Sequence, residues 1–185
     1  MTNLTTKSKY LIDANVFIQA KNFHYRFDFC QGFWDWIIQA NQANIVYSID
    51  KVKIELERGD KNDPVRKWID MLPHNFFLTD IKDQAVMASY RQIMQWNHSN
   101  NHYTVQAKQE FANHNVADAF LIAMAQTHEY KIVTYEKSNP DRKRRIPIPD
   151  AANVFGIECI MIYDLLSQYA EDNFSLKANT ARRLE

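Results

Sequence analysis

Tyr10-Leu11-Ile12-Asp13 is a short apolar run that ends at an acidic residue. Consecutive apolar residues bounded by polar ones are typical of a strand that is buried on both faces of a sheet. Later in the chain, Lys131-Ile132-Val133-Thr134 contains a second such run, and Glu136 follows it closely. The two runs therefore predict two buried strands, each with an acid at its carboxyl end.

Helix-like and strand-like patterns alternate in the rest of the chain. A turn into Val16-Phe17-Ile18 is expected after the first strand, and Ser48 is expected to cap a helix. On the spacing of their apolar residues, helices are predicted over 28–43, 49–58, 63–72, 83–98, 104–112 and 116–128 and from Tyr163 onward. Further strands are predicted at 44–47, 76–78 and 157–162.

This alternation predicts the fold class and the domain organisation. Strands that alternate with helices favour an α/β fold, here a three-layer α/β/α arrangement with a parallel five-stranded central sheet. No internal repeat or linker interrupts the pattern. Residues 1–185 are therefore expected to form a single domain, with a flexible tail from about residue 172.

The composition excludes several classes of function. The 185 residues include 3 glycines, too few for a glycine-rich phosphate loop, so P-loop and dinucleotide-binding proteins are excluded. Lys plus Arg and Asp plus Glu each number 22, so any nucleic-acid binding must depend on a local patch. The 2 cysteines lie far apart and form no zinc or disulfide motif, which favours a reducing compartment. No apolar run approaches the roughly 20 residues that span a bilayer, so we expect a cytoplasmic protein without a membrane partner.

Four acids from distant parts of the chain are candidates for one site. In a parallel sheet, Asp13 and Glu136 both project at the carboxyl edge, where open α/β sheets place their ligands. Asp118 is the only ionisable residue in the apolar helix segment 116–125, and such a charge is costly unless it is paired or bound to a metal. Glu55 lies at the margin of an apolar helix stripe, from which it can reach inward.

Each acid taken alone also has a purely structural explanation. Asn115 can cap the helix that follows it, with Asp118 accepting a hydrogen bond in a variant capping box. Glu55, like Glu57, can be a solvated helix residue, and Asp13 can be a turn residue after a strand. The prediction of a site therefore depends on the four acids meeting at one edge of the sheet.

Four segments of the sequence resemble the PIN-domain family. The segments are Tyr10-Leu11-Ile12-Asp13-Ala14-Asn15, Ile54-Glu55-Leu56, Val116-Ala117-Asp118-Ala119 and Ile132-Val133-Thr134-Tyr135-Glu136. The resemblance covers nearly the whole chain and implies a PIN-like fold. It further implies a VapC-like ribonuclease, with an antitoxin protein and a second copy of the chain as partners.

The resemblance also implies a role for each matched residue. It makes Asp13, Glu55, Asp118 and Glu136 catalytic, and it makes Asp13, Asp118 and Glu136 the ligands of Mg²⁺ or Mn²⁺. Asn15 and Thr134 would support them. The fourth acid of the family is usually an aspartate in a T-x-D arrangement, so Glu136 departs from the pattern and resembles a subgroup with glutamate there. Asp150 is the alternative fourth acid.

This set of residues suits phosphodiester hydrolysis. The reaction needs charge neutralisation on the phosphate and an activated water, and magnesium held by carboxylates supplies both. Without metal, clustered acids repel one another. We therefore expect at least one of them to have a raised pKa, through like-charge proximity and partial burial.

A basic patch, Arg142-Lys143-Arg144-Arg145, follows the fourth acid. Such a loop can hold RNA phosphates beside the metal, although a solvated loop or a surface for an acidic partner has the same composition. Tyr135 and Tyr103 are candidates for stacking on bases.

Three hypotheses of function follow. The first is a metal-dependent endoribonuclease, the toxin of a toxin–antitoxin pair, although the pattern is equally compatible with single-stranded DNA as substrate. The second is a catalytically silent PIN scaffold that acts as an RNA-binding or protein-interaction module. The third is a receiver-type signalling domain with Asp13 or Asp118 as phosphate acceptor, which the absence of an acidic pair at Asp13-Ala14 disfavours.

Overall fold

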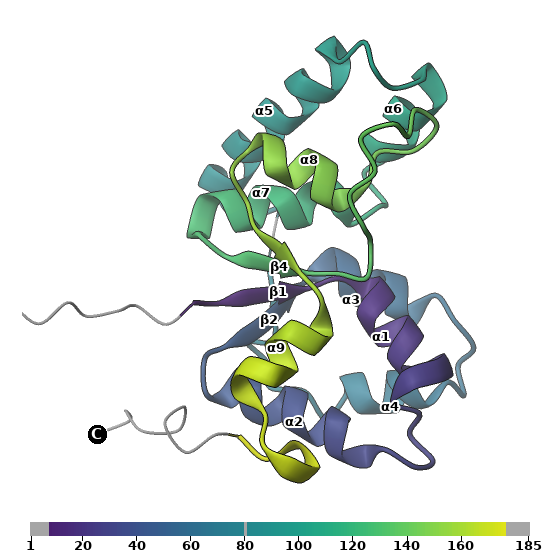
Figure 1. The fold of residues 1–185 in the computed structure, drawn as a ribbon, viewed down its shortest axis with the longest axis vertical. Coiled ribbons are helices and arrows are strands. Elements are labelled where there is room, and N and C mark those ends of the chain that lie inside the picture. Colours follow the sequence, from purple (N-terminus) through teal and green to yellow (C-terminus); the bar gives the residue numbers. More distant parts are fainter. Residues whose placement is uncertain (1–7, 80, 177–185) are drawn as a thin grey trace, which may run out of the picture.

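A five-stranded parallel sheet forms the centre of the protein. The computed structural model describes residues 8–79 and 81–176 (Figure 1). The strand order is β3-β2-β1-β4-β5. The strands are β1 (Tyr10–Ile12), β2 (Val46–Ile49), β3 (Phe77–Leu78), β4 (Lys131–Val133) and β5 (Cys159–Ile160). The predicted α/β class and the parallel five-stranded sheet are confirmed.

Helices cover both faces of this sheet, which completes the three layers (Figure 1). In Figure 1, α5, α7 and α8 lie on one side of the strands, and α2, α4 and α9 lie on the other. The described helices are α1 (Ala14–Gln19), η1 (Ala20–His24), α2 (Gln31–Gln42), α3 (Asp50–Glu57), α4 (Pro64–Ile69), α5 (Gln84–Ser99), α6 (Val105–Phe111), α7 (Asp118–His128), α8 (Ile148–Val154), α9 (Ile162–Tyr169) and η2 (Asp172–Phe174). Among the described residues, no helix is long and apolar enough to cross a membrane.

Aromatic side chains fill the core on one side of the sheet. Phe17, Trp34, Trp68 and Phe76 are all fully buried. The ring centroids of Trp34 and Trp68 lie 4.8 Å apart, and those of Phe17 and Trp68 lie 5.4 Å apart. Burial of large rings contributes a major part of the hydrophobic free energy of folding. The strands that carry the acids are therefore fixed against a rigid layer.

The segment after β1 differs from its prediction. After β1, where a turn into Val16-Phe17-Ile18 was expected, the chain forms the helix α1, which continues into the π-helix η1. Val16 and Phe17 are both fully buried, so core packing outweighs the preference of such residues for extended structure. Asp13 is the N-cap residue of α1, which turns the chain away from the sheet edge.

Three other boundaries also differ. Ser48 was expected to cap a helix, but it is buried within β2, where its hydroxyl donates to the Ile12 carbonyl oxygen at 2.7 Å. The helix α8 was not predicted; Pro147 is its N-cap residue, and a proline in its first turn is a recognised start signal. The tail was expected from about residue 172. Residues 172–174 of this segment form η2, in which Phe174 lies against Tyr25, and residues 177–185 lie outside the described residues.

Candidate active site

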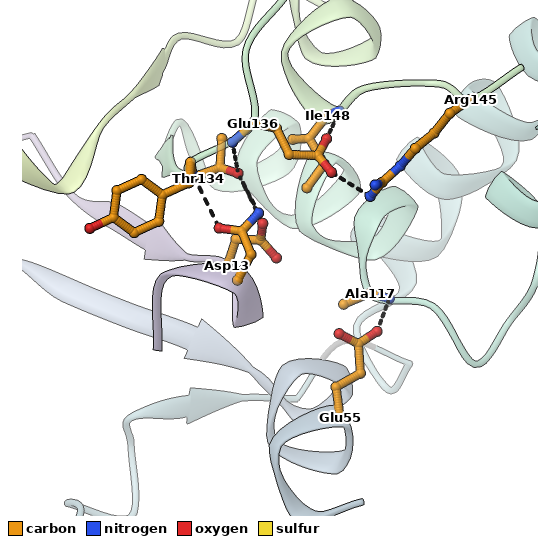
Figure 2. Close-up of polar contacts among 9 residues, drawn as sticks. Asp13, Glu55, Ala117, Thr134, Glu136, Arg145 and Ile148 are labelled. Atoms are coloured by element: carbon orange, nitrogen blue, oxygen red, sulfur yellow. Dashed lines mark hydrogen bonds and ion pairs between the residues drawn. The ribbon is translucent and has the colours of Figure 1, made fainter. Parts of the chain in front are cut away.

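The Thr134 hydroxyl organises the residues around Asp13. Asp13 is 4% exposed at the end of β1, and its Oδ2 accepts a hydrogen bond from Thr134 Oγ1 at 2.9 Å (Figure 2). Thr134 Oγ1 itself accepts hydrogen bonds from Asn15 Nδ2 at 3.0 Å and from the Glu136 backbone N–H at 3.1 Å. Asn15 Oδ1 in turn accepts from the Tyr135 N–H at 3.0 Å. The structure therefore joins Asn15 and Thr134 to Asp13 in one hydrogen-bonded network.

Replacement of Thr134 by valine tests this network. Thr134→Val keeps the shape of the side chain but removes the hydroxyl that donates to Asp13 Oδ2, and it leaves two N–H groups without their acceptor. Buried polar groups without partners are costly, so the free energy of unfolding should fall by roughly 2 kcal/mol in urea denaturation. Thr134→Ser retains the hydroxyl and is the matched control. A loss in Thr134→Ser with none in Thr134→Val would show that the methyl group, and not the hydrogen bonds, stabilises this position.

Glu55 faces the site from α3. Its Oε1 accepts a hydrogen bond from the Ala117 N–H at 2.9 Å (Figure 2). On the same helix, Lys51 Nζ donates to the His114 carbonyl oxygen at 2.8 Å, and Arg58 donates to the next carbonyl along the chain at 3.3 Å. These three side chains hold the segment that precedes α7. The neighbouring Glu57 instead lies 3.9 Å from Lys53 in an ion pair, so Glu55 is the glutamate of α3 that faces the site.

The start of α7 corrects one structural explanation of Asp118. Asn115 was a candidate cap for this helix, but the N-cap residue is Ala117, and no side chain caps the helix in the manner of a capping box. The Glu55 carboxylate receives the Ala117 N–H instead. The free N–H groups at a helix start need acceptors, and Glu55 supplies one from another helix.

Asp118 is a half-buried carboxylate without a partner. Within the described part of the chain, its side chain makes no hydrogen bond or ion pair. Its pKa is raised well above the usual value, first by burial and then by the negative charges of Asp13, Glu136 and Glu55. The Arg145 guanidinium partly offsets this rise. Asp118 therefore shares one electrostatic environment with the other three predicted acids.

Glu136 is held by both of its oxygens. Its Oε2 accepts from the Ile148 N–H at 2.7 Å, and its Oε1 forms an ion pair with Arg145 (Figure 2). Asp150, the alternative fourth acid, has a different role. Both of its carboxylate oxygens accept from the Asn139 N–H at 3.1 Å, and it is not among the charges that shift the Asp118 pKa. Glu136 is therefore the fourth acid that the fold brings to the site.

The predicted rise in carboxylate pKa is confirmed, and burial is its main cause. The Asp13 pKa is raised to about 7, mainly by burial and also by the charges of Glu136 and Glu55, while the Thr134 hydroxyl and the Ala14 N–H lower it in part. The Glu55 pKa is also raised, mainly by burial, and is lowered in part by the Ala117 N–H and by Arg58. Of the two causes expected from the sequence, desolvation thus contributes more than like-charge repulsion.

The four carboxylates are not arranged as a set of metal ligands among the described residues. Within residues 8–79 and 81–176, no group of three or more His, Cys, Asp or Glu side chains is arranged to hold a metal ion. Glu55 and Glu136 accept hydrogen bonds from backbone N–H groups, those of Ala117 and Ile148. The donor chemistry nevertheless suits Mg²⁺, which prefers carboxylate oxygens and is often bound through one or two of them with water as the remaining ligands.

Two clefts flank the site, and Arg145 lines both of them. One has a volume of about 160 Å³ and is lined by Glu55, Ala107, Glu110, Phe111, Val116, Asp118, Arg145 and Ile146. The other has a volume of about 210 Å³ and is lined by Glu136, Lys137, Ser138, Asn139, Arg142, Arg145 and Pro147. A ligand in either cleft would therefore meet both a carboxylate and a guanidinium.

The basic loop, defined as residues 142–145, is anchored beside these clefts. The Lys143 carbonyl oxygen accepts from the Thr104 N–H at 2.9 Å, and the Arg142 carbonyl oxygen lies 3.2 Å from His102 Nε2. Every side chain of the loop is exposed, including that of Arg144. The structure therefore pairs Arg145 with an acid of the cluster and places Arg142 in the lining of the cleft beside Glu136.

The fold and the site together define a class of protein, an open parallel α/β sheet with carboxylates gathered at its carboxyl edge. The chain belongs to a family described as a domain of unknown function, DUF4411, whose sequence model matches residues 10–172. The match begins with β1 and includes all four acids. No curated protein matches the chain in sequence.

Proposed function

We propose that the protein is a metal-dependent endoribonuclease that hydrolyses RNA with Mg²⁺ or Mn²⁺ bound at Asp13, Asp118 and Glu136. The observation that carries the proposal is the unpartnered Asp118 carboxylate, half-buried among three other acids within the described chain. A buried charge among like charges is unfavourable unless a cation compensates it. A divalent cation would supply that compensation and would also neutralise the phosphate and activate water.

Each residue of the site would have its own role in binding the cation or the substrate. Asp13 and Asp118 would bind the cation, and Thr134 would orient Asp13 through its hydroxyl. Glu136 would join them by releasing Arg145, which would then pair with a substrate phosphate. Glu55 would act on the start of α7 through the Ala117 N–H and thereby position Asp118. The exposed cations of the basic loop would bind neighbouring phosphates.

The resemblance to the PIN-domain family extends the proposal to the biological setting. We propose a cytoplasmic toxin whose partners are an antitoxin protein and a second copy of the chain. The alternative is a catalytically silent scaffold that binds RNA or protein. One observation favours this alternative, namely that the described acids are not arranged as a set of three metal ligands.

Metal dependence distinguishes the two functions. We expect the protein to cleave a fluorescent single-stranded RNA in Mg²⁺ or Mn²⁺ and not in EDTA. Millimolar cation should also raise the melting temperature, because a ligand that binds only the folded state stabilises it. Asp35→Asn, which changes an exposed carboxylate on α2, is the control and should retain both properties. Absence of cleavage together with an unchanged melting temperature would favour the scaffold.

Arg145 is expected to compete with the metal for Glu136. Arg145→Gln removes a positive charge next to the cluster, so it should tighten Mn²⁺ binding roughly tenfold in isothermal titration calorimetry. Arg144→Gln changes the net charge equally, and Arg144 has no hydrogen bond or ion pair to any described residue. Equal tightening in both variants would indicate a long-range charge effect and would contradict direct competition.

A further inference from the structure

An exposed group of aromatic rings lies beside the acid cluster. We define the aromatic patch as His24, Tyr135 and Tyr163, with Phe23 at its edge. The His24 ring centroid lies 5.5 Å from that of Tyr135 and 6.1 Å from that of Tyr163. The centroids of Tyr135 and Tyr163 are 5.7 Å apart. The three rings therefore contact one another pairwise and form a continuous surface.

This surface is open to solvent. Phe23 is 70% exposed and Tyr163 is 41% exposed, and His24 is also exposed. Tyr135, which the sequence suggested as a stacking residue, is half-buried between its neighbours. The rings available to a ligand are therefore those of His24 and Tyr163, with Phe23 at the edge, while Tyr135 packs against His24 and Tyr163.

Three distant segments build the patch. Tyr135 follows β4, and Tyr163 lies in the first turn of α9. His24 ends the π-helix η1, in which the Tyr25 N–H donates to the Ala20 carbonyl oxygen at 2.8 Å. A π-helix is rare and frequently occurs at a functional site. Here it brings the His24 ring against Tyr135.

The patch is joined to the acid cluster through the backbone of Tyr135. The Tyr135 N–H donates to Asn15, which also donates to the Thr134 hydroxyl that binds Asp13. The residue after Tyr135 is Glu136, which pairs with Arg145 of the basic loop. The aromatic patch, the carboxylates and Arg145 of the basic loop are thus connected through neighbouring residues of one hydrogen-bonded network.

We propose that the aromatic patch is a base-stacking platform for single-stranded nucleic acid. This inference rests on the proposed function, since it places bases on His24 and Tyr163 and the adjoining phosphates between the acid cluster and the basic loop. Aromatic faces stack on any base, and cations beside them bind the backbone. In a duplex the base faces are covered by their neighbours, so the ligand class is unpaired RNA or DNA.

Binding without metal tests the platform separately from cleavage. The probe is a short fluorescent single-stranded RNA, followed by anisotropy in EDTA at low salt. His24→Ala and Tyr163→Ala should each weaken binding roughly tenfold, while His24→Phe and Tyr163→Phe should retain it. Phe29→Ala is the matched control, because Phe29 is 65% exposed and contacts Arg26 instead of the patch. A single-stranded DNA of the same sequence should show the same losses, and a duplex should show none.

The outcomes distinguish this inference from the proposed function. Wild-type affinity in both alanine variants, or an equal loss in Phe29→Ala, would overturn the platform even where the protein cleaves RNA with metal. Failure of the wild-type protein to bind either single strand would overturn it as well. Losses confined to His24→Ala and Tyr163→Ala, in a protein that cleaves nothing with metal, would support the platform and reject the nuclease.

Discussion

Asp118→Asn is expected to abolish metal-dependent RNA cleavage and to raise the melting temperature of the metal-free protein. Loss of a cation ligand removes several kcal/mol of transition-state stabilisation, which corresponds to at least a roughly hundredfold loss of rate. In EDTA the same change removes a charge that burial and three neighbouring acids destabilise. Asparagine has nearly the same shape, so packing is preserved.

The opposite signs of these two effects make the prediction specific. Most substitutions at partly buried positions lower stability, so a rise in melting temperature is not expected for a residue with a purely structural role. Melting curves in EDTA and in Mn²⁺, together with cleavage of a fluorescent RNA, measure both effects. The exposed Asp35→Asn should change neither of them. A lower melting temperature for Asp118→Asn in EDTA would show that an unrecognised partner stabilises this carboxylate.

The metal-free protein is expected to lose stability as the pH rises. The Asp13 pKa is about 7 in the folded protein against an ordinary value of 3.8. Below pH 3.8 the group is protonated in both states and costs nothing. Between these values the unfolded chain releases its proton while the folded chain retains it, so the free energy of unfolding decreases until the pH passes about 7. The raised pKa values of Asp118 and Glu55 act in the same direction.

Urea denaturation at pH 5 and pH 8 in EDTA measures this effect. We expect the wild-type protein to lose roughly 3 kcal/mol more than Asp13→Asn between these pH values, because asparagine has no proton to release. Mn²⁺ at pH 8 should restore the stability of the wild-type protein and not that of the variant. The same pH dependence in both proteins would show that Asp13 does not carry the burial cost assigned to it.

The strand positions could be predicted because they depend on simple patterns. The run that ends at Asp13 forms β1 over the expected residues, since apolar residues there are buried on both faces. The parallel arrangement then brings Glu136 to the same edge, as the topology requires. Asp118 could also be identified, because it is a single charge in an apolar helix.

The contacts within the site could not be read from the sequence. The pairing of Glu136 with Arg145 depends on how the loop between them folds, and the acceptance of the Ile148 N–H depends on α8, which was not predicted. Lys51, Glu55 and Arg58 do carry a signal, because spacings of four and three residues place them on one face of α3. Their shared target before α7 emerges only in three dimensions.

The aromatic patch was missed for a related reason. His24 lies in a segment whose π-helical geometry has no sequence signature, and the segment before it was predicted as a turn. Tyr163 was assigned to the last helix without any reason to relate it to Tyr135. Local propensity does not predict which aromatic rings contact one another where tertiary packing determines the backbone conformation.

The pairing of β1 with β4 divides the chain into two complementary parts. The part before α5 contributes β1, β2 and β3 with Asp13 and Glu55, and the part after β3 contributes β4 and β5 with Asp118 and Glu136. Fragments separated in the connection between β3 and α5 would each carry half of the carboxylates. Under the proposed function, cation binding would return only when the two fragments reassemble. Cation binding would then report on the association of the fragments, as activity does in a split reporter protein.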